Sequence, residues 1–140
     1  MQVYFKKIDF IFYNERKIRR IVKETRIDSV KPEIKNGSGL SDPTASAAIR
    51  NLSPLPAITV CGETLKFPES WLAVIDKTYS WCKRQSLTHF ESVRRKYLGE
   101  HYLSICRLLH ISPATFNNLI HRARQYAALQ AVQFRLLFIQ

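Results

Sequence analysis

Apolar residues recur at helical spacing in the N-terminal part of the chain. Between about Ile8 and Thr25 they follow one another at steps of three and four residues, with basic residues between them. This pattern is typical of an amphipathic α-helix with one apolar face and one basic face. Such a basic face is commonly just solvated, although it also suits a membrane surface or a DNA backbone. We therefore predict a basic amphipathic helix within residues 1–29.

The helical pattern then gives way to turn-forming residues. Prolines, glycines and Asn36 crowd together in VKPEIKNGSGLSDP, a composition that resists regular structure. We expect residues 30–41 to be a flexible linker and residues 42–140 to form a helical domain. Asp42 and Pro43 suit the N-cap and the first position of a short helix at the start of that domain.

A short β-hairpin and a core helix are predicted next. Two β-prone runs, Ile58–Cys61 and Thr64–Phe67, flank Gly62-Glu63 at hairpin spacing. Apolar residues of ESWLAVIDKTYSWCKRQ, after Pro68, recur at helical spacing and indicate a helix of the core. The expected fold class is therefore mostly α, with a short hairpin.

A further helix is predicted in LTHFESVRRKYLG. Thr88 and Glu91 have the spacing of a capping box, in which each side chain binds a backbone N–H at the start of a helix. Gly99 is placed to end the helix. The basic cluster Arg94, Arg95 and Lys96 lies near that end.

The segment SICRLLHISPATFNNLIHRAR, Ser104 to Arg124, has the spacing of a helix-turn-helix. Its apolar residues stand at the offsets where the two helices of such a unit touch. Ser112 is placed to cap the second helix and Pro113 to occupy its first position. The turn has His110 where most such motifs have glycine, which adopts positive φ freely. We expect a C-terminal helix-turn-helix at about residues 100–125.

The second of these helices would present a polar face suited to DNA. Burial of its apolar residues leaves Ala114, Asn117, Asn118 and His121 pointing outward in the half that enters the major groove in such proteins. Asparagine can bind two edges of adenine, and alanine can contact the methyl group of thymine. The residues expected to contact phosphates are Arg94, Arg95, Lys96, Arg107, Thr115, Arg122 and Arg124.

The charge of the chain supports a polyanionic partner. The net charge is +11, with ten basic and five acidic residues in 1–35, two and three in 36–70, and ten and three in 71–140. Two basic blocks therefore flank a neutral middle, a distribution that favours nucleic acid or an anionic surface. No apolar run reaches the roughly 18 residues that cross a bilayer, and the first residues do not resemble a secretory signal. We expect a cytoplasmic protein with no membrane partner.

Other classes of site lack their sequence patterns. The three cysteines are widely spaced and, with the four histidines, do not form the compact grouping of a zinc site. No nucleophile–base arrangement and no glycine-rich phosphate loop is present. We therefore expect no catalytic residues, no metal and no cofactor.

Several motifs together resemble one family. These are SGLSDPTASAAI, FPESWLAVIDKTY, RRKYLG and ICRLLHISPATFNNLI, closing on AALQAVQF, and they span Ser38 to Phe134. With them the chain resembles the RinA/ArpU group of bacteriophage transcriptional regulators. The resemblance implies a nucleoid-associated activator of phage genes, with a module similar to region 4 of bacterial sigma factors. It also implies a recognition-helix role for Ser112, Ala114, Asn117, Asn118 and His121.

The leading hypothesis is thus a sequence-specific regulator that binds double-stranded DNA. Two alternatives are a module that binds RNA polymerase, as in an antiterminator, and the small subunit of a phage terminase. The apolar C-terminus, RQYAALQAVQFRLLFIQ, predicts that the second helix continues into a surface that is either buried within the chain or shared between copies. We expect a homo-oligomer, because paired half-sites are the usual way in which such motifs gain affinity.

Overall fold

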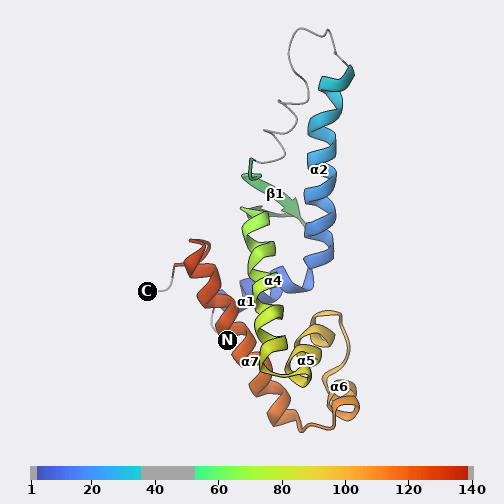
Figure 1. Ribbon diagram of the computed structural model, residues 1–140, viewed down its shortest axis with the longest axis vertical. Helices are drawn as coiled ribbons and strands as arrows, with labels where there is room; N and C mark the ends of the chain where they lie inside the picture. The colour runs from blue at the N-terminus through green and yellow to red at the C-terminus, as the bar shows by residue number, and fades with distance from the viewer. Residues whose placement is uncertain (1–2, 36–52, 139–140) are drawn as a thin grey trace. The chain divides into compact units, whose positions relative to one another are not determined.

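The computed structural model describes residues 3–35 and 53–138 (Figure 1), with the backbone alone for residues 28–35. It confirms the mostly-α fold class, with one two-stranded antiparallel sheet among the described residues. Its two compact units are Met1–Glu15 with Ser70–Gln140, and Arg16–Glu69. These boundaries differ from those expected near residues 30 and 42. The reason is that the apolar face of the first helix packs against helices near the C-terminus.

The predicted N-terminal helix is two helices, α1 (Val3–Tyr13) and α2 (Glu15–Lys35). The break lies at Asn14, whose side-chain amide donates to the Phe10 carbonyl at 2.8 Å and so competes with the backbone for a helical acceptor. Because α2 extends to Lys35, residues 30–35 of the expected linker are helical. The rest of that linker, and the short helix expected from Asp42, lie outside the described residues.

The first unit also contains α4 (Pro68–Gln85) from Ser70 onward, α5 (Leu87–Tyr97), α6 (Tyr102–Leu109) and α7 (Pro113–Gln133). Helix α1 packs on α5 and α7, and α5, α6 and α7 contact one another. Full burial of a side chain such as Ile8 or Ile11 stabilises the fold by about 1.5–3 kcal/mol. Aromatic contacts join α4 to this cluster, including Phe12 against Tyr79 at a ring distance of 5.7 Å.

The ends of α5 are fixed by local hydrogen bonds. Its N-cap is Ser86, whose hydroxyl accepts from the His89 N–H at 3.0 Å. The N-cap therefore lies two residues before Thr88, where the capping-box spacing predicts it. At the other end Gly99 has φ +97° and donates to the Lys96 carbonyl, while Glu100 donates to that of Arg95. This is the pattern of a Schellman motif, and it confirms Gly99 as the stop.

The second unit contains most of α2 and the hairpin of β1 (Ala57–Val60) and β2 (Glu63–Lys66). The hairpin is confirmed, but its turn is Cys61-Gly62 rather than Gly62-Glu63. Both turn residues have positive φ, as the tight turn that matches strand twist requires. Buried apolar residues from the hairpin and from α2 supply the interior of this unit: Ile58, Val60, Leu65, Ile18 and Val22.

An ion pair in the second unit joins α2 to the start of α4. Arg26 Nη2 lies 2.5 and 2.6 Å from the two carboxylate oxygens of Glu69 and 3.0 Å from the Ser53 carbonyl oxygen. The backbone N–H of Leu55 donates to the same carboxylate at 2.9 Å. Partial burial alone would raise the pKa of Glu69, but these hydrogen bonds and the Arg26 charge hold it below its ordinary value. The carboxylate is therefore ionised at neutral pH.

A buried histidine connects α5 to α7. His89 is 1% exposed, its ring meets Trp81 edge to face at 5.2 Å, and its Nε2 lies 2.9 Å from the Leu119 carbonyl oxygen. Because that carbonyl can only accept, Nε2 carries the hydrogen. Burial lowers the pKa of His89, the Leu119 carbonyl partly opposes this, and the positive charge of Arg122 adds to the lowering. The folded protein therefore holds a neutral imidazole at this position.

This lowered pKa predicts a loss of stability in acid. As the pH falls through the ordinary histidine range near 6.5, the unfolded chain takes up a proton more readily than the folded chain, so the free energy of unfolding decreases. The slope cannot exceed about 1.4 kcal/mol per pH unit, the limit for one proton. His89→Gln keeps an N–H donor without a titrating ring and should lose this component. Urea unfolding at pH 7.5, 6.5 and 5.5 checks it, and identical pH slopes in both proteins would show that His89 is not responsible.

Candidate nucleic-acid interface

Helices α6 and α7 form the predicted helix-turn-helix, with a three-residue turn between Leu109 and Pro113. His110 lies in the left-handed region, at φ 56° and ψ 47°. The backbone N–H groups of His110 and Ile111 both donate to the Cys106 carbonyl, the latter at 3.0 Å. The histidine therefore takes the conformation for which glycine was expected. Histidine visits this region more often than most residues, at a cost of about 1–2 kcal/mol.

The start of α7 has the cap predicted from the sequence. Ser112 Oγ accepts from the Thr115 N–H at 3.1 Å and lies 2.9 Å from Thr115 Oγ1, to which it donates. Pro113 is the first residue of the helix. Both hydroxyls lie at the exposed start of α7.

The N-terminal half of α7 has one buried face and one exposed polar face. Phe116 and Ile120 are buried against the neighbouring helices. The structure places the remaining residues predicted to contact bases together at steps of three and four along the exposed side: Ala114, Asn117, Asn118 and His121. Among these, His121 also contacts α1, because its ring meets the Phe5 ring edge to face at 5.5 Å.

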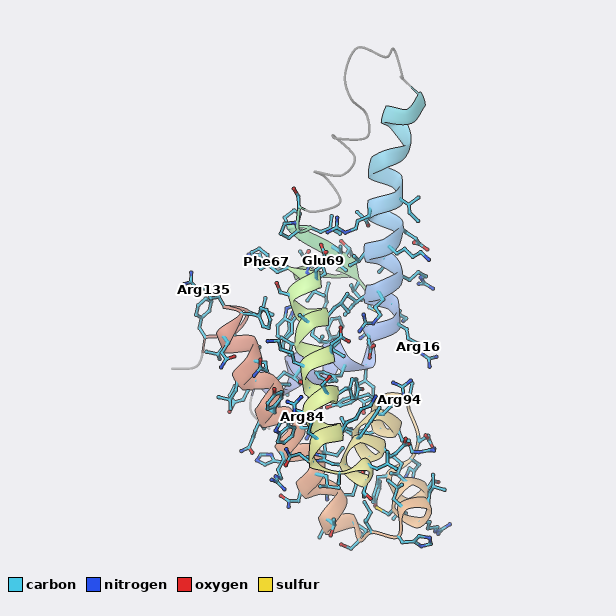
Figure 2. All side chains as sticks on the ribbon, in the orientation of Figure 1. Arg16, Phe67, Glu69, Arg84, Arg94 and Arg135 are labelled. Carbon is cyan, nitrogen blue, oxygen red and sulfur yellow. The ribbon has the colours of Figure 1, made fainter. Side chains whose placement is uncertain are left out.

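The basic residues predicted to contact phosphates fall into different environments. Arg107 on α6 and Arg122 on α7 are exposed. Arg94, labelled on α5 in Figure 2, is exposed and lies over the Phe90 ring at 6.0 Å. Lys96 donates to the Tyr13 hydroxyl at 2.7 Å, and Arg95 binds Glu91 and Glu100 at 3.0 and 3.1 Å. Phosphate binding by Arg95 would have to compete with these two carboxylates.

Arg124 was predicted to contact phosphate, and the structure corrects this prediction. Its Nε and Nη2 donate to the two carboxylate oxygens of Asp9 at 3.0 and 2.8 Å, in the parallel geometry that favours arginine–carboxylate pairs. The two side chains are only 17% and 16% exposed. The hydroxyl of Tyr97 donates to Asp9 at 2.6 Å. Burial and the Asp9 charge raise the pKa of Tyr97, so it stays a donor. Arg124 is therefore a structural residue.

Sequence reasoning did not identify Asp9. The signal available was a single carboxylate set among apolar residues of a helix in a strongly basic chain. A charge in that position is tolerated only with a partner, because desolvation of an unpaired ion is costly. The sequence did not reveal which of many basic residues was the partner, since Arg124 is 115 positions away.

Comparisons of the chain with protein-family models, with curated proteins and with solved structures find no match.

None of the helices in the described ranges is both long and apolar enough to cross a bilayer. Within residues 3–35 and 53–138, no group of three or more His, Cys, Asp and Glu side chains is placed to hold a metal ion. The resemblance to phage regulators therefore stays a prediction, and the geometry of α6 and α7 carries the functional argument.

The Asp9–Arg124 pair predicts a specific loss of stability. Asp9→Asn removes the charge and one acceptor, leaving a largely buried guanidinium without its counter-ion, and should lower the free energy of unfolding by about 2–3 kcal/mol. The matched control is Glu91→Gln, which breaks an ion pair whose side chains are about one third exposed and should cost about 0.5 kcal/mol or less. Urea unfolding at pH 7 measures both variants. Equal losses would contradict the role assigned to Asp9.

Proposed function

We propose that this protein is a sequence-specific regulator that binds double-stranded DNA through the helix-turn-helix of α6 and α7. The observation that carries the proposal is the exposed face of the N-terminal half of α7. It groups two asparagines, an alanine and a histidine, while the opposite face is fixed to α5 and α6. Helices held in this way enter the major groove with that half against base edges.

Each exposed residue has a chemical role in this proposal. Asn117 and Asn118 would each bind adenine through both its N6 amino group and N7, and Ala114 would contact a thymine methyl group. A good bidentate contact discriminates against the wrong base by about 1–3 kcal/mol. Arg107, Arg122 and the Thr115 hydroxyl would hold phosphates on either side, and the net charge of +11 would add long-range attraction.

The resemblance to RinA/ArpU regulators supports a narrower form of the proposal. In that form the protein activates phage or prophage genes in a bacterial cell, by a module similar to region 4 of sigma factors. An RNA polymerase contact is the second candidate, and one observation favours it. Helix α6 exposes Leu103 and Leu108, which are 40% and 53% exposed, and a phosphate-facing surface has no need of these apolar side chains.

Base reading is tested by selection of bound fragments from random DNA, followed by binding measurements on the enriched sequence. The double variant Asn117→Ala with Asn118→Ala should lose at least about tenfold of its preference for that sequence over unrelated DNA, because at least one base contact disappears. Its salt dependence should not change. The control is Thr64→Ala, an exposed position of the hairpin in the other unit. No enriched sequence, or unchanged preference in the double variant, would contradict base reading and favour the polymerase-binding module.

We also propose that two copies bind together through the C-terminal half of α7. Part of the apolar C-terminal segment is accounted for within one chain, since Ala127, Ala128 and Ala131 are buried. Leu129 and Val132, however, are 60% and 37% exposed on a stretch, Gln125–Gln133, that contains no charged residue. In a molecule of charge +11, such a surface lets two copies approach with little repulsion.

Sedimentation equilibrium at micromolar concentration tests the paired state. The full chain should sediment as a dimer, and Leu129→Glu should shift it toward the monomer because two buried carboxylates would face each other. A wild-type protein that is monomeric throughout this range would contradict the proposal. A ring-sized assembly would instead favour the terminase small subunit.

A further inference from the structure

A shallow groove between α4 and α7 has no role in the contacts described so far. It encloses about 330 Å³ and is lined by Asp76, Lys77, Ser80 and Arg84 of α4 and by Tyr126 of α7. Lys77, Ser80 and Arg84 are spaced by three and four residues, so they share one face of the helix. All three are exposed. Figure 2 shows Arg84 toward the C-terminal end of α4, where this helix lies beside α7.

One wall of the groove is built from stacked aromatic rings. The ring of Tyr126 stacks on that of Trp81 with 4.6 Å between centroids and 8° between planes, and Trp81 in turn meets the buried His89. At the other end the Lys77 ammonium lies over the Phe134 ring at 5.3 Å. These contacts hold the walls in place without using hydrogen-bond donors of Lys77. Its ammonium can therefore donate to a ligand while it stays over the ring.

The charges of the groove favour an anion. Two cationic side chains and two that carry a hydroxyl line it, against one carboxylate, Asp76, among the described lining residues. The donors are those that proteins use for phosphate: a guanidinium fork, an ammonium and a hydroxyl.

The α7 wall of the groove, Tyr126, follows the exposed N-terminal half of the same helix. Residues four apart on a helix are neighbours on its surface, so Asn118, Arg122 and Tyr126 form one ridge. The ridge rises about 12 Å from Asn118 to Tyr126, at about 1.5 Å per residue. A single duplex that meets Asn118 can therefore extend its backbone past Arg122 to Lys77 and Arg84.

We propose that this groove binds phosphodiester groups of the DNA backbone beside the sequence that α7 reads, with Lys77, Ser80 and Arg84 as donors. The inference rests on the proposed function and adds α4 to the interface. It assigns these residues to affinity and positioning rather than to sequence discrimination, since phosphate groups are the same at every base pair.

The test compares the salt dependence of binding to the selected DNA. Log K falls as log salt concentration rises, and each phosphate contact contributes about 0.9 to the steepness of that fall. The double variant Lys77→Gln with Arg84→Gln should therefore have a slope that is shallower by about 2. Affinity should fall equally for selected and unrelated sequences. The control is Lys23→Gln with Lys66→Gln, which removes the same charge from exposed positions of the other unit and should leave the slope near that of the wild type.

The outcomes separate this inference from the proposed function. A wild-type protein that does not bind DNA overturns the proposed function itself. If wild-type binding depends steeply on salt but the groove variant has the same slope as the control variant, only the phosphate contacts of the groove are overturned. The charge-retaining variant Lys77→Arg with Arg84→Lys should restore the slope, and its failure to do so would also count against the phosphate contacts.

A free phosphate compound is the other source of the same chemistry. Titration of inorganic phosphate, followed by the fluorescence of Trp81 behind Tyr126, distinguishes the two. Weak, unsaturated changes at millimolar concentration are expected for a site that binds backbone phosphates. Saturation at micromolar concentration in the wild type, absent from Lys77→Gln with Arg84→Gln, would assign the groove to a small anion and overturn the DNA contact.

Discussion

The arrangement of the first unit depends on the pairing of Asp9 with Arg124. One carboxylate on α1 receives two hydrogen bonds from α7 and one from Tyr97 of α5, so a single acidic group fixes three helices. Such a pair is costly to desolvate and contributes only when its geometry is good and its other hydrogen-bonding positions are filled. Here the parallel contacts and the tyrosine fulfil both conditions. The pair is directional, in a way that the surrounding apolar contacts are not, and it therefore sets the position of α1 along α7.

This constraint divides α7 into two parts with different roles. Beyond Arg124, one face of α7 is buried and consists of three alanines, Ala127, Ala128 and Ala131. Their small side chains allow other elements to approach this face closely. Before Arg124, the helix is supported by α5 and α6 and exposes its asparagines. A recognition helix must be held rigidly, because base contacts require placement within fractions of an ångström. In the DNA-binding function proposed above, the anchoring of the C-terminal part would hold α7 in place without covering the exposed asparagines.

Local features were predictable from the sequence because their physical causes are local. The Ser112 cap, the Gly99 stop and the hairpin each depend on residues within a few positions, and each is present. The errors arose where two local solutions compete. Ser86 precedes Thr88 and takes the cap, and the side chain of Asn14 ends one helix so that two form where one was predicted. The error at Arg124 has another cause. Surface and interior arginines look alike in sequence, and only the fold brings Asp9 to this one.

The turn between α6 and α7 shows what a helix-turn-helix requires of its central residue. The requirement is a left-handed backbone that lets two successive N–H groups return to the Cys106 carbonyl, and glycine is only the least costly way to meet it. His110 meets it at a cost of about 1–2 kcal/mol, which the two hydrogen bonds offset at about 0.5–1.5 kcal/mol each. The left-handed turn and both of its hydrogen bonds therefore form without glycine. It follows that a search for such motifs should test whether a residue tolerates positive φ, rather than ask for glycine at this position.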